Sequence, residues 1–344
     1  MYDGQGGRTE SLQTCHCAVE HIIKQLLTMA AADMDPAVRR AIVERFLPSF
    51  LGPDASGSAD GGPSHDEGLL MFFAQVESAN ALTLCLNDTN AHVRLAALTI
   101  MGKIAHLNPA VSFPVLRRHL QQLLGDLSSA ADSARLDETA VLLSAMIEQC
   151  PELVMPNLHT IQDKLAKKLD QARARIKEHG GKSKSGHSMT DSIMQVISSL
   201  VSKATVLYRP FLPHVLESVI EAITDRWNDA KYLPAAVACL GNITGCTGYV
   251  IEPYINHPAL LPAMLELLDQ TYPASLHVQV VKVLGIIGAL GPHTHKLIQV
   301  LLRFTCLVQP PAVLRCSLRE LQVPTILQAR PSPRAFNSVF SPIV

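Results

Sequence analysis

The amino-acid sequence predicts an all-α fold in which pairs of helices are stacked as repeats. Hydrophobic residues make up 48 % of the 344 residues, but aromatic residues only 5 %. Leucine, alanine, isoleucine and valine therefore supply the apolar surface, and this mix favours packed helices over a β-sandwich. Apolar residues also recur at helical spacing in several segments, and prolines recur at nearly regular intervals.

The prolines define the register of the predicted repeat. Pro114, Pro156, Pro210 and Pro253 are separated by 42, 54 and 43 residues, and Pro292 follows less regularly after another 39. Proline fits the first turn of a helix, where its missing N–H would have no partner. Each proline is therefore expected to start the second helix of a pair. Two helices in a period of roughly 40–47 residues are typical of HEAT and armadillo repeats, which form an α-solenoid, an armadillo-type superhelix.

The segment 88–105 is a clear example of an expected first helix. Either Asp88 or Asn90 is suited to cap its start, because both side chains accept hydrogen bonds from backbone N–H groups. Its small residues, including Ala96 and Gly102, would let a neighbouring helix approach closely. Six units are predicted in all, beginning near Cys15, Leu69, Asp132, Asp191, Lys231 and Leu276.

Two glycines occupy matching places in later first helices. Gly241 and Gly285 are 44 residues apart. A glycine inside a helix costs about 1 kcal/mol relative to alanine, so its recurrence predicts a close helix–helix contact at both places. Ala96, Gly241 and Gly285, together with the four regular prolines, are the predicted structural markers of the repeat.

Composition divides the chain into five parts. Glycine, proline and serine are concentrated in one internal stretch, and several prolines interrupt the end of the chain. We hypothesise that this end is foreign, from a truncated or mis-spliced gene model. The predicted parts are a disordered N-terminus (1–14), a first HEAT-like unit (15–52), a flexible loop (53–68), HEAT-like repeats with a basic loop at 171–188 (69–299), and a tail outside the repeat register (300–344).

The segment 164–184 holds eight lysines and arginines against only Asp170 and Glu178. Such a run can contact nucleic acid or acidic lipid. The preferred interpretation is a helix that runs out into a solvated loop, since the segment carries no aromatic residue on which a base could stack. The net charge of −1 also provides no general attraction to nucleic acid, and we expect no nucleic-acid partner.

The sequence offers no convincing catalytic, cofactor-binding or metal site, and we expect no cofactor. Residues 180–183 resemble the end of a phosphate-binding loop, but Ile176 stands where that loop requires glycine. His293 and His295 could ligate a metal, yet no second pair has zinc-site spacing. No lipase-type serine motif or zinc-protease helix motif occurs. The chain is therefore expected not to be an enzyme.

The eight cysteines are scattered and form no Cys-x-x-Cys motif, which is typical of free, buried thiols in a reducing cytoplasm. No run of 18 apolar residues occurs, so we expect no membrane insertion. The polar first ten residues also lack the apolar core of a signal peptide.

Three strings exceed a generic repeat pattern: 241–254, which contains Thr-Gly-Tyr-Val-Ile-Glu-Pro-Tyr, 257–268, and 283–296, which contains Leu-Gly-Ile-Ile-Gly-Ala-Leu. With matching motifs upstream in the same order, they resemble the N-terminal HEAT-repeat region of the target of rapamycin (TOR) serine/threonine protein kinases. The resemblance extends from about His21 to Lys296, roughly four-fifths of the chain.

The resemblance implies a function without catalysis in this segment. The kinase domain of TOR proteins lies far C-terminal of the similar region, so no catalytic residue is carried over. The resemblance implies a scaffold arm that binds companion subunits such as raptor, within signalling that couples nutrients to growth, translation and autophagy. It also implies dimerisation only in the full-length protein, and a cytoplasmic location that extends to the nucleus and to lysosomal or vacuolar membrane surfaces.

Two other hypotheses stay open on the sequence. The chain could be a stand-alone HEAT or armadillo adaptor, such as a transport receptor or phosphatase scaffold, or an enzyme whose site the sequence does not reveal. Tyr249 and Tyr254 are candidate contacts for a partner, although packing between repeats is the preferred role for both.

Overall fold

The computed structural model describes residues 6–50, 72–130, 132–179, 183–224, 231–269 and 272–288, with side chains from residue 17 onward. Within these ranges every regular element is a helix, which confirms the expected all-α class. The chain divides into two compact units, Met1–Gly248 and Tyr249–Val344. The predicted loop at 53–68 and the predicted tail at 300–344 lie outside the described residues, as do His293 and His295.

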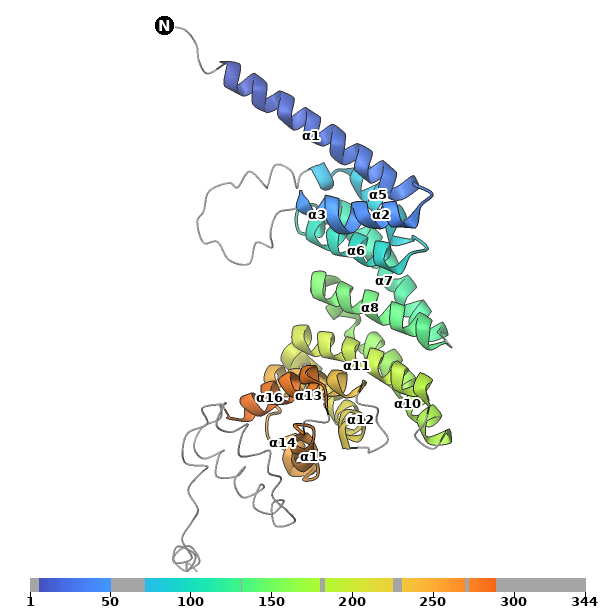
Figure 1. The fold of residues 1–344 in the computed structure, drawn as a ribbon, viewed down its shortest axis with the longest axis vertical. Coiled ribbons are helices and arrows are strands. Elements are labelled where there is room, and N and C mark those ends of the chain that lie inside the picture. The colour runs from blue at the N-terminus through green and yellow to red at the C-terminus, as the bar shows by residue number, and fades with distance from the viewer. Residues whose placement is uncertain are drawn as a thin grey trace, which may run out of the picture. The chain divides into compact units, whose positions relative to one another are not determined.

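In the first unit, a layer of helices is formed by the first helix of each pair (Figure 1). Each member of this layer contacts the next one along the chain. The members are α2 (Pro36–Ala41), which continues through the π-helical turn η1 (Ile42–Phe46) into α3 (Leu47–Ser49), then α6 (Ala91–Ala105), α8 (Ser133–Gln149), α11 (Lys184–Ala204) and α13 (Leu233–Thr247).

The second helices of the pairs form the other layer of the same unit, and again each contacts the next. Alternation between two such layers is the architecture of an α-solenoid of HEAT/armadillo-like helical pairs, as predicted. The members are α1 (Gly6–Ala32), α5 (Val76–Leu86), α7 (Pro109–Ser129), the segment α9–η2–α10 (Pro151–Val154, Met155–Asn157, Leu158–Glu178), and the segment η3–α12 (Thr205–Phe211, Leu212–Thr224).

The second unit contains α14 (Glu252–Asn256), α15 (Leu260–Glu266) and α16 (Ala274–Gly288). In both units leucine, isoleucine, valine and methionine fill the interior. In α6, for example, Leu98, Met101 and Ile104 are all fully buried. Each buried side chain of this kind stabilises the fold by about 1.5–3 kcal/mol relative to its exposed state, so apolar contact between neighbouring helices is the main source of stability.

The marker prolines do not all start a helix. Pro114 is the sixth residue of α7, which begins at Pro109, so the prediction that Pro114 starts this helix is wrong. Pro109 occupies the first turn instead, where proline is favoured. An interior proline removes one backbone hydrogen bond, but α7 continues through it to Ser129.

The other marker prolines lie near the starts of second-layer segments. Pro156 lies in η2 and Pro210 in η3, the short 3₁₀ helices that lead into α10 and α12. Both are the sixth residue of their helical segment, as Pro114 is in α7. Pro253 lies in the first turn of α14. The proline register therefore identifies equivalent places in three second-layer segments, just inside the segment rather than at its start.

Two disordered or irregular regions predicted from composition are helical. Helix α1 begins at Gly6, so the prediction of disorder over 1–14 is wrong from that residue onward. The basic loop predicted at 171–188 is wrong for residues 171–178 and 184–188, because α10 continues to Glu178 and α11 begins at Lys184 rather than near Asp191. Helix formation is cooperative and lysine and arginine are good helix formers, so α10 and α11 extend into the basic stretch from either side.

An added Cβ at Gly285 would have no atom of the described residues within 4 Å, so the close helix contact expected there is not found among those residues. Gly102 makes such a contact instead: a Cβ at this position of α6 would lie 2.5 Å from Cβ of Gln149, at the end of α8. Ala96 and Gly241 are half-buried in α6 and α13, and their predicted role as contact markers stays a prediction.

Alanine should have opposite effects at two glycines of the first unit. Gly102→Ala must displace Gln149, and overpacking costs about 1–3 kcal/mol, which exceeds the gain in helix propensity. Gly125→Ala in α7 meets no atom within 4 Å and should stabilise by up to about 1 kcal/mol. Urea denaturation of the two variants measures both changes, and a stabilising Gly102→Ala would contradict the close approach of α6 and α8.

Candidate functional site

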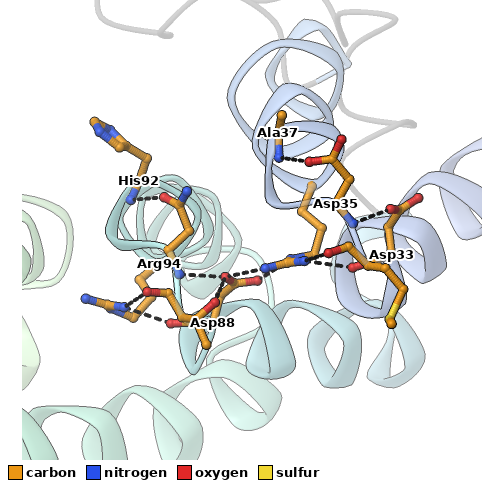
Figure 2. Close-up of polar contacts among 10 residues, drawn as sticks. Asp33, Asp35, Ala37, Asp88, His92 and Arg94 are labelled. Atoms are coloured by element: carbon orange, nitrogen blue, oxygen red, sulfur yellow. Dashed lines mark hydrogen bonds and ion pairs between the residues drawn. The ribbon is translucent and has the colours of Figure 1, made fainter.

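Arg39 and Arg94 occupy equivalent places in consecutive first-layer helices, α2 and α6 (Figure 2). The Nη1 atom of Arg39 donates to the carbonyl oxygens six and five residues before it, at 2.7 and 3.3 Å. Nη1 of Arg94 donates to the carbonyls at the same two offsets, at 2.7 and 3.1 Å. Each guanidinium therefore binds the turn that precedes its own helix.

Each of these arginines also reaches a carboxylate of the next pair. Nε and Nη2 of Arg39 bind the two oxygens of Asp88 at 2.6 and 2.9 Å, and Nη2 of Arg94 binds Glu138 at 2.7 Å. Such bidentate pairs are among the stronger ion pairs. The Arg39 hydrogen bond holds the pKa of Asp88 below its ordinary value, against the opposing effect of burial. These contacts join successive repeats and fix their spacing.

Figure 2 also shows how the two helices are capped. The Asp35 carboxylate accepts from Ala37 N at 2.8 Å, and the Asn90 side chain accepts from His92 N at 2.9 Å. Asn90 is therefore the cap of α6, while Asp88 binds Arg39, so the two candidates for the cap have different roles.

Polar contacts continue along the first layer beyond Arg94. The carboxylate of Asp137 on α8 accepts hydrogen bonds from Ser188, at 3.0 Å, and Ser192 on α11. Asn242 on α13 donates to Ser198 Oγ at 2.6 Å. Each first-layer helix from α2 to α13 is thus linked to the next by at least one hydrogen bond as well as by apolar packing.

The basic segment around α10 uses several of its cations inside the fold. Lys164 donates to the carbonyl of Leu124 at 3.1 Å, and buried Lys168 donates to that of Ala130 at 2.7 Å. Desolvation lowers the pKa of Lys168, with a smaller contribution from the charge of Arg175. Arg173 forms an ion pair with Glu221 of α12. These side chains connect second-layer helices.

A groove of about 300 Å³ opens beside the Arg94 contacts, between the end of α5, α7 and α8. Its floor is partly apolar and its rim is polar. The lining residues are Leu86, Asn87, Asp88, Arg94, His119, Gln122, Leu123, Asp126, Ser129, Ala130, Arg135, Glu138, Thr139 and Leu142. A second, smaller hollow of about 150 Å³ shares His119 with this groove.

His119 is the unusual residue of the groove. It is only 6 % exposed, and its Nε2 atom has no hydrogen-bond partner. Desolvation lowers the pKa of His119; the positive charge of Arg94 lowers it further, and Asp126 acts in the opposite direction. The imidazole is therefore mainly neutral at pH 7, and its Nε2 atom, which solvent does not reach, has no hydrogen-bond partner.

Two charged side chains of the groove also lack partners within the described part of the chain. Asp88 is paired with Arg39 and Arg94 with Glu138. By contrast, the carboxylate of half-buried Asp126 and the guanidinium of exposed Arg135 form no hydrogen bond or ion pair there. The groove thus offers one free negative group, one free positive group and one neutral imidazole.

Sequence reasoning did not identify His119. The signal for it was a histidine on the apolar face of α7, in line with Leu116 and Leu123. None of the predicted marker residues lines the larger groove, and Pro114 alone lines the smaller hollow. In the ranges that the structure describes, no three His, Cys, Asp or Glu side chains gather as a metal site would require, and no helix is long and apolar enough to cross a bilayer.

Comparison with known proteins relates this chain to one family of kinases. Residues 250–321 match the family described as "Serine/threonine-protein kinase mTOR domain". The serine/threonine-protein kinase TOR of Arabidopsis thaliana is 34 % identical over 85 % of this chain and 10 % of its own length. The TOR kinase of Oryza sativa is 34 % identical over 80 % of this chain and 10 % of its own length. The tor1 kinase of Schizosaccharomyces pombe is 27 % identical over 81 % of this chain and 10 % of its own length.

These matches confirm the similarity to TOR kinases that the sequence motifs indicate. The chain spans about a tenth of the length of the curated relatives it matches. The family match extends past residue 299 to residue 321, so the hypothesis of a foreign end is wrong for residues 300–321. Among solved structures, a designed armadillo repeat protein aligns with 77 % of this chain and 99 % of its own, at 12 % identity and a TM-score of 0.44.

Loss of the Asp88 charge should weaken the fold in a pH-dependent way. The native pKa of Asp88 is lowered, so its contribution is present above the unfolded-state value near pH 4 and is lost as pH falls through the native value. Asp88→Asn should therefore destabilise the chain at pH 7 and flatten its stability profile between about pH 5 and 2. Denaturant melts at several pH values test this, with Glu217→Gln as the control, because the Glu217 side chain is 67 % exposed and lies 3.9 Å from Arg173.

His119 should show a pH dependence of the same sign as Asp88, but at higher pH. Its pKa is lowered on folding, so its neutral form contributes fully above about pH 6.5 and stability falls as pH drops below that value. In His119→Leu this part of the loss should disappear, with little change at pH 7, because an unsatisfied buried nitrogen is replaced by an apolar group. NMR titration of the imidazole measures the pKa directly; a value at or above 6.5 would contradict the described burial.

Proposed function

We propose that this chain is a non-catalytic scaffold segment of a TOR-type serine/threonine kinase and that it mediates protein–protein interactions in TOR signalling. The signalling in question is the nutrient-dependent control of growth, translation and autophagy. The observation that carries the proposal is the similarity of 85 % of this chain to a tenth of a TOR kinase, in a segment folded as helical-pair repeats.

The physical character of the repeats favours binding over catalysis. Burial raises the pKa of the Cys85 and Cys150 thiols to about 11 and that of Cys239 to about 12, so these three thiols are protonated and unreactive at pH 7. Many polar side chains link one repeat to the next. Helical repeats of this type present long surfaces on which a partner can lie.

Exposed apolar residues supply candidate contacts on that surface. Leu84 on α5 is 63 % exposed, and Leu207, in the turn before α12, is 67 % exposed. Of the two tyrosines considered from the sequence, Tyr254 is buried, which favours packing, and Tyr249 is half-buried. Leu84 and Leu207 are therefore the better candidates for contact with a partner.

The partner class that follows from the similarity is a companion subunit of a TOR complex, such as a raptor-like protein. We infer no nucleic-acid partner and no insertion into membrane, and a cytoplasmic location that reaches lysosomal or vacuolar surfaces and the nucleus through such complexes. Dimerisation is proposed only for the full-length kinase.

Two assays, one of partner binding and one of phosphotransfer, distinguish a scaffold from an enzyme. In calorimetry, the purified 344-residue chain should bind a purified raptor-like subunit with a dissociation constant of about 10 µM or tighter. A dissociation constant of about 10 µM corresponds to a binding free energy of roughly −7 kcal/mol. The chain should transfer no phosphate from ATP above a no-protein control. Phosphotransfer would exclude a non-catalytic segment, and no association at about 100 µM would exclude this partner class.

A further inference from the structure

We propose that the groove between α5, α7 and α8 binds a segment of a partner polypeptide, which inserts one uncharged hydrogen-bonding side chain against His119 and flanks it with a basic and an acidic residue. The basic residue would bind Asp126 and the acidic one Arg135. This inference deepens the proposed scaffold function and rests on it, because it assigns the place and the chemistry of one contact.

The first step of the argument is the unsatisfied nitrogen of His119. Buried polar atoms in folded proteins nearly always have a hydrogen-bond partner, and a lasting exception needs an explanation. Here Nε2 itself is closed to solvent, but His119 lines a groove that opens to solvent, so an inserted group that displaces the atoms covering Nε2 can supply the missing partner. A side chain of glutamine, asparagine, serine or threonine has the hydrogen-bonding groups required for this.

The second step concerns the charge of that inserted group. His119 is neutral, and the nearby Arg94 is already paired with Glu138 at 2.7 Å. A charged group placed against Nε2, which solvent does not reach, would lose its hydration, whereas the two free charges of the groove stand on half-buried Asp126 and exposed Arg135. An uncharged side chain is therefore favoured at the floor.

The third step concerns the two free charges. Asp126 lies two helical turns beyond His119 on α7, and Arg135 lies on α8. Both line the groove, and neither side chain has a hydrogen-bond or ion-pair partner among the residues described. Because one is negative and the other positive, the complementary ligand carries one charge of each sign on either side of its neutral group.

The fourth step distinguishes a polypeptide from other ligands. Sites for free small molecules usually enclose most of the ligand, whereas Asn87, Gln122, Arg135 and Glu138 leave this groove exposed along its rim. Its volume of about 300 Å³ accommodates one or two side chains of a chain lying across it. A phosphate-rich ligand is disfavoured, because three carboxylates, of Asp88, Asp126 and Glu138, also line the groove.

The test uses the full 344-residue chain labelled with ¹⁵N-histidine and four defined probes. The first two are acetyl-Lys-Gln-Glu-amide and the reversed acetyl-Glu-Gln-Lys-amide. The third is whichever of these two peptides binds more tightly, with alanine in place of glutamine, and the fourth is free glutamine. At least one of the first two peptides should shift the His119 imidazole signal saturably at millimolar concentration. The alanine peptide and free glutamine should each bind at least about fivefold more weakly, since they lack the neutral group or the charge pair.

Variants identify the contacts. In uniformly ¹⁵N-labelled protein, His119→Leu should abolish the saturable binding seen through the amide signals of α7. Asp126→Asn or Arg135→Gln should weaken that binding by up to about fivefold, as expected for one exposed ion pair. His92→Leu is the matched control, because His92 is an exposed histidine of α6 that does not line the groove. Unchanged binding in both charge variants would overturn the assignment of the flanking residues.

Two results would overturn the proposal as a whole: no shift of the His119 signal by either peptide at about 20 mM, or an equally strong shift by free glutamine. Binding of the raptor-like subunit to the wild-type chain is measured in parallel. If the raptor-like subunit binds but neither peptide shifts the His119 signal, the groove proposal fails and the scaffold function stands. If both are absent, the scaffold function fails as well.

Discussion

The bidentate contact between Arg39 and Asp88 fixes how one helical pair meets the next. The same guanidinium binds the carbonyl groups of the turn before α2, so a single side chain ties a turn, its own helix and the following repeat together. Arg94 repeats the arrangement one unit later with Glu138. Apolar burial supplies most of the stability, but it is non-directional, and these polar contacts specify which register of stacked helices is adopted.

Much of the fold could be predicted from the sequence because helical periodicity and proline spacing are local signals. Segment 88–105 showed apolar spacing, and α6 lies there. The position of Pro114 inside α7 could not be predicted as easily, because Pro109 competes for the same first turn. Gly102 shows the limit of recurrence as a signal: it lies outside the recurring pair Gly241 and Gly285, and only the three-dimensional packing shows that it approaches a neighbour closely.

No local signal in the sequence predicts the groove. Its members come from four helices, and the feature that distinguishes His119 is the absence of a partner for Nε2, which is a property of the packed structure. Likewise, sequence alone left open whether Asp88 or Asn90 caps α6, because the choice depends on Arg39, 49 residues away. The basic segment was misjudged for a related reason: Lys168 and Arg173 find their partners on other helices.

The three buried thiols have a practical consequence for following how the repeats come apart. Cys85, Cys150 and Cys239 lie in different helical pairs, and each becomes accessible to an alkylating reagent only when its surroundings open. In repeat proteins, neighbouring units open semi-independently, because each is held mainly by the units next to it. The order in which these natural labels react therefore records the sequence of events by which the array loosens, without any introduced probe.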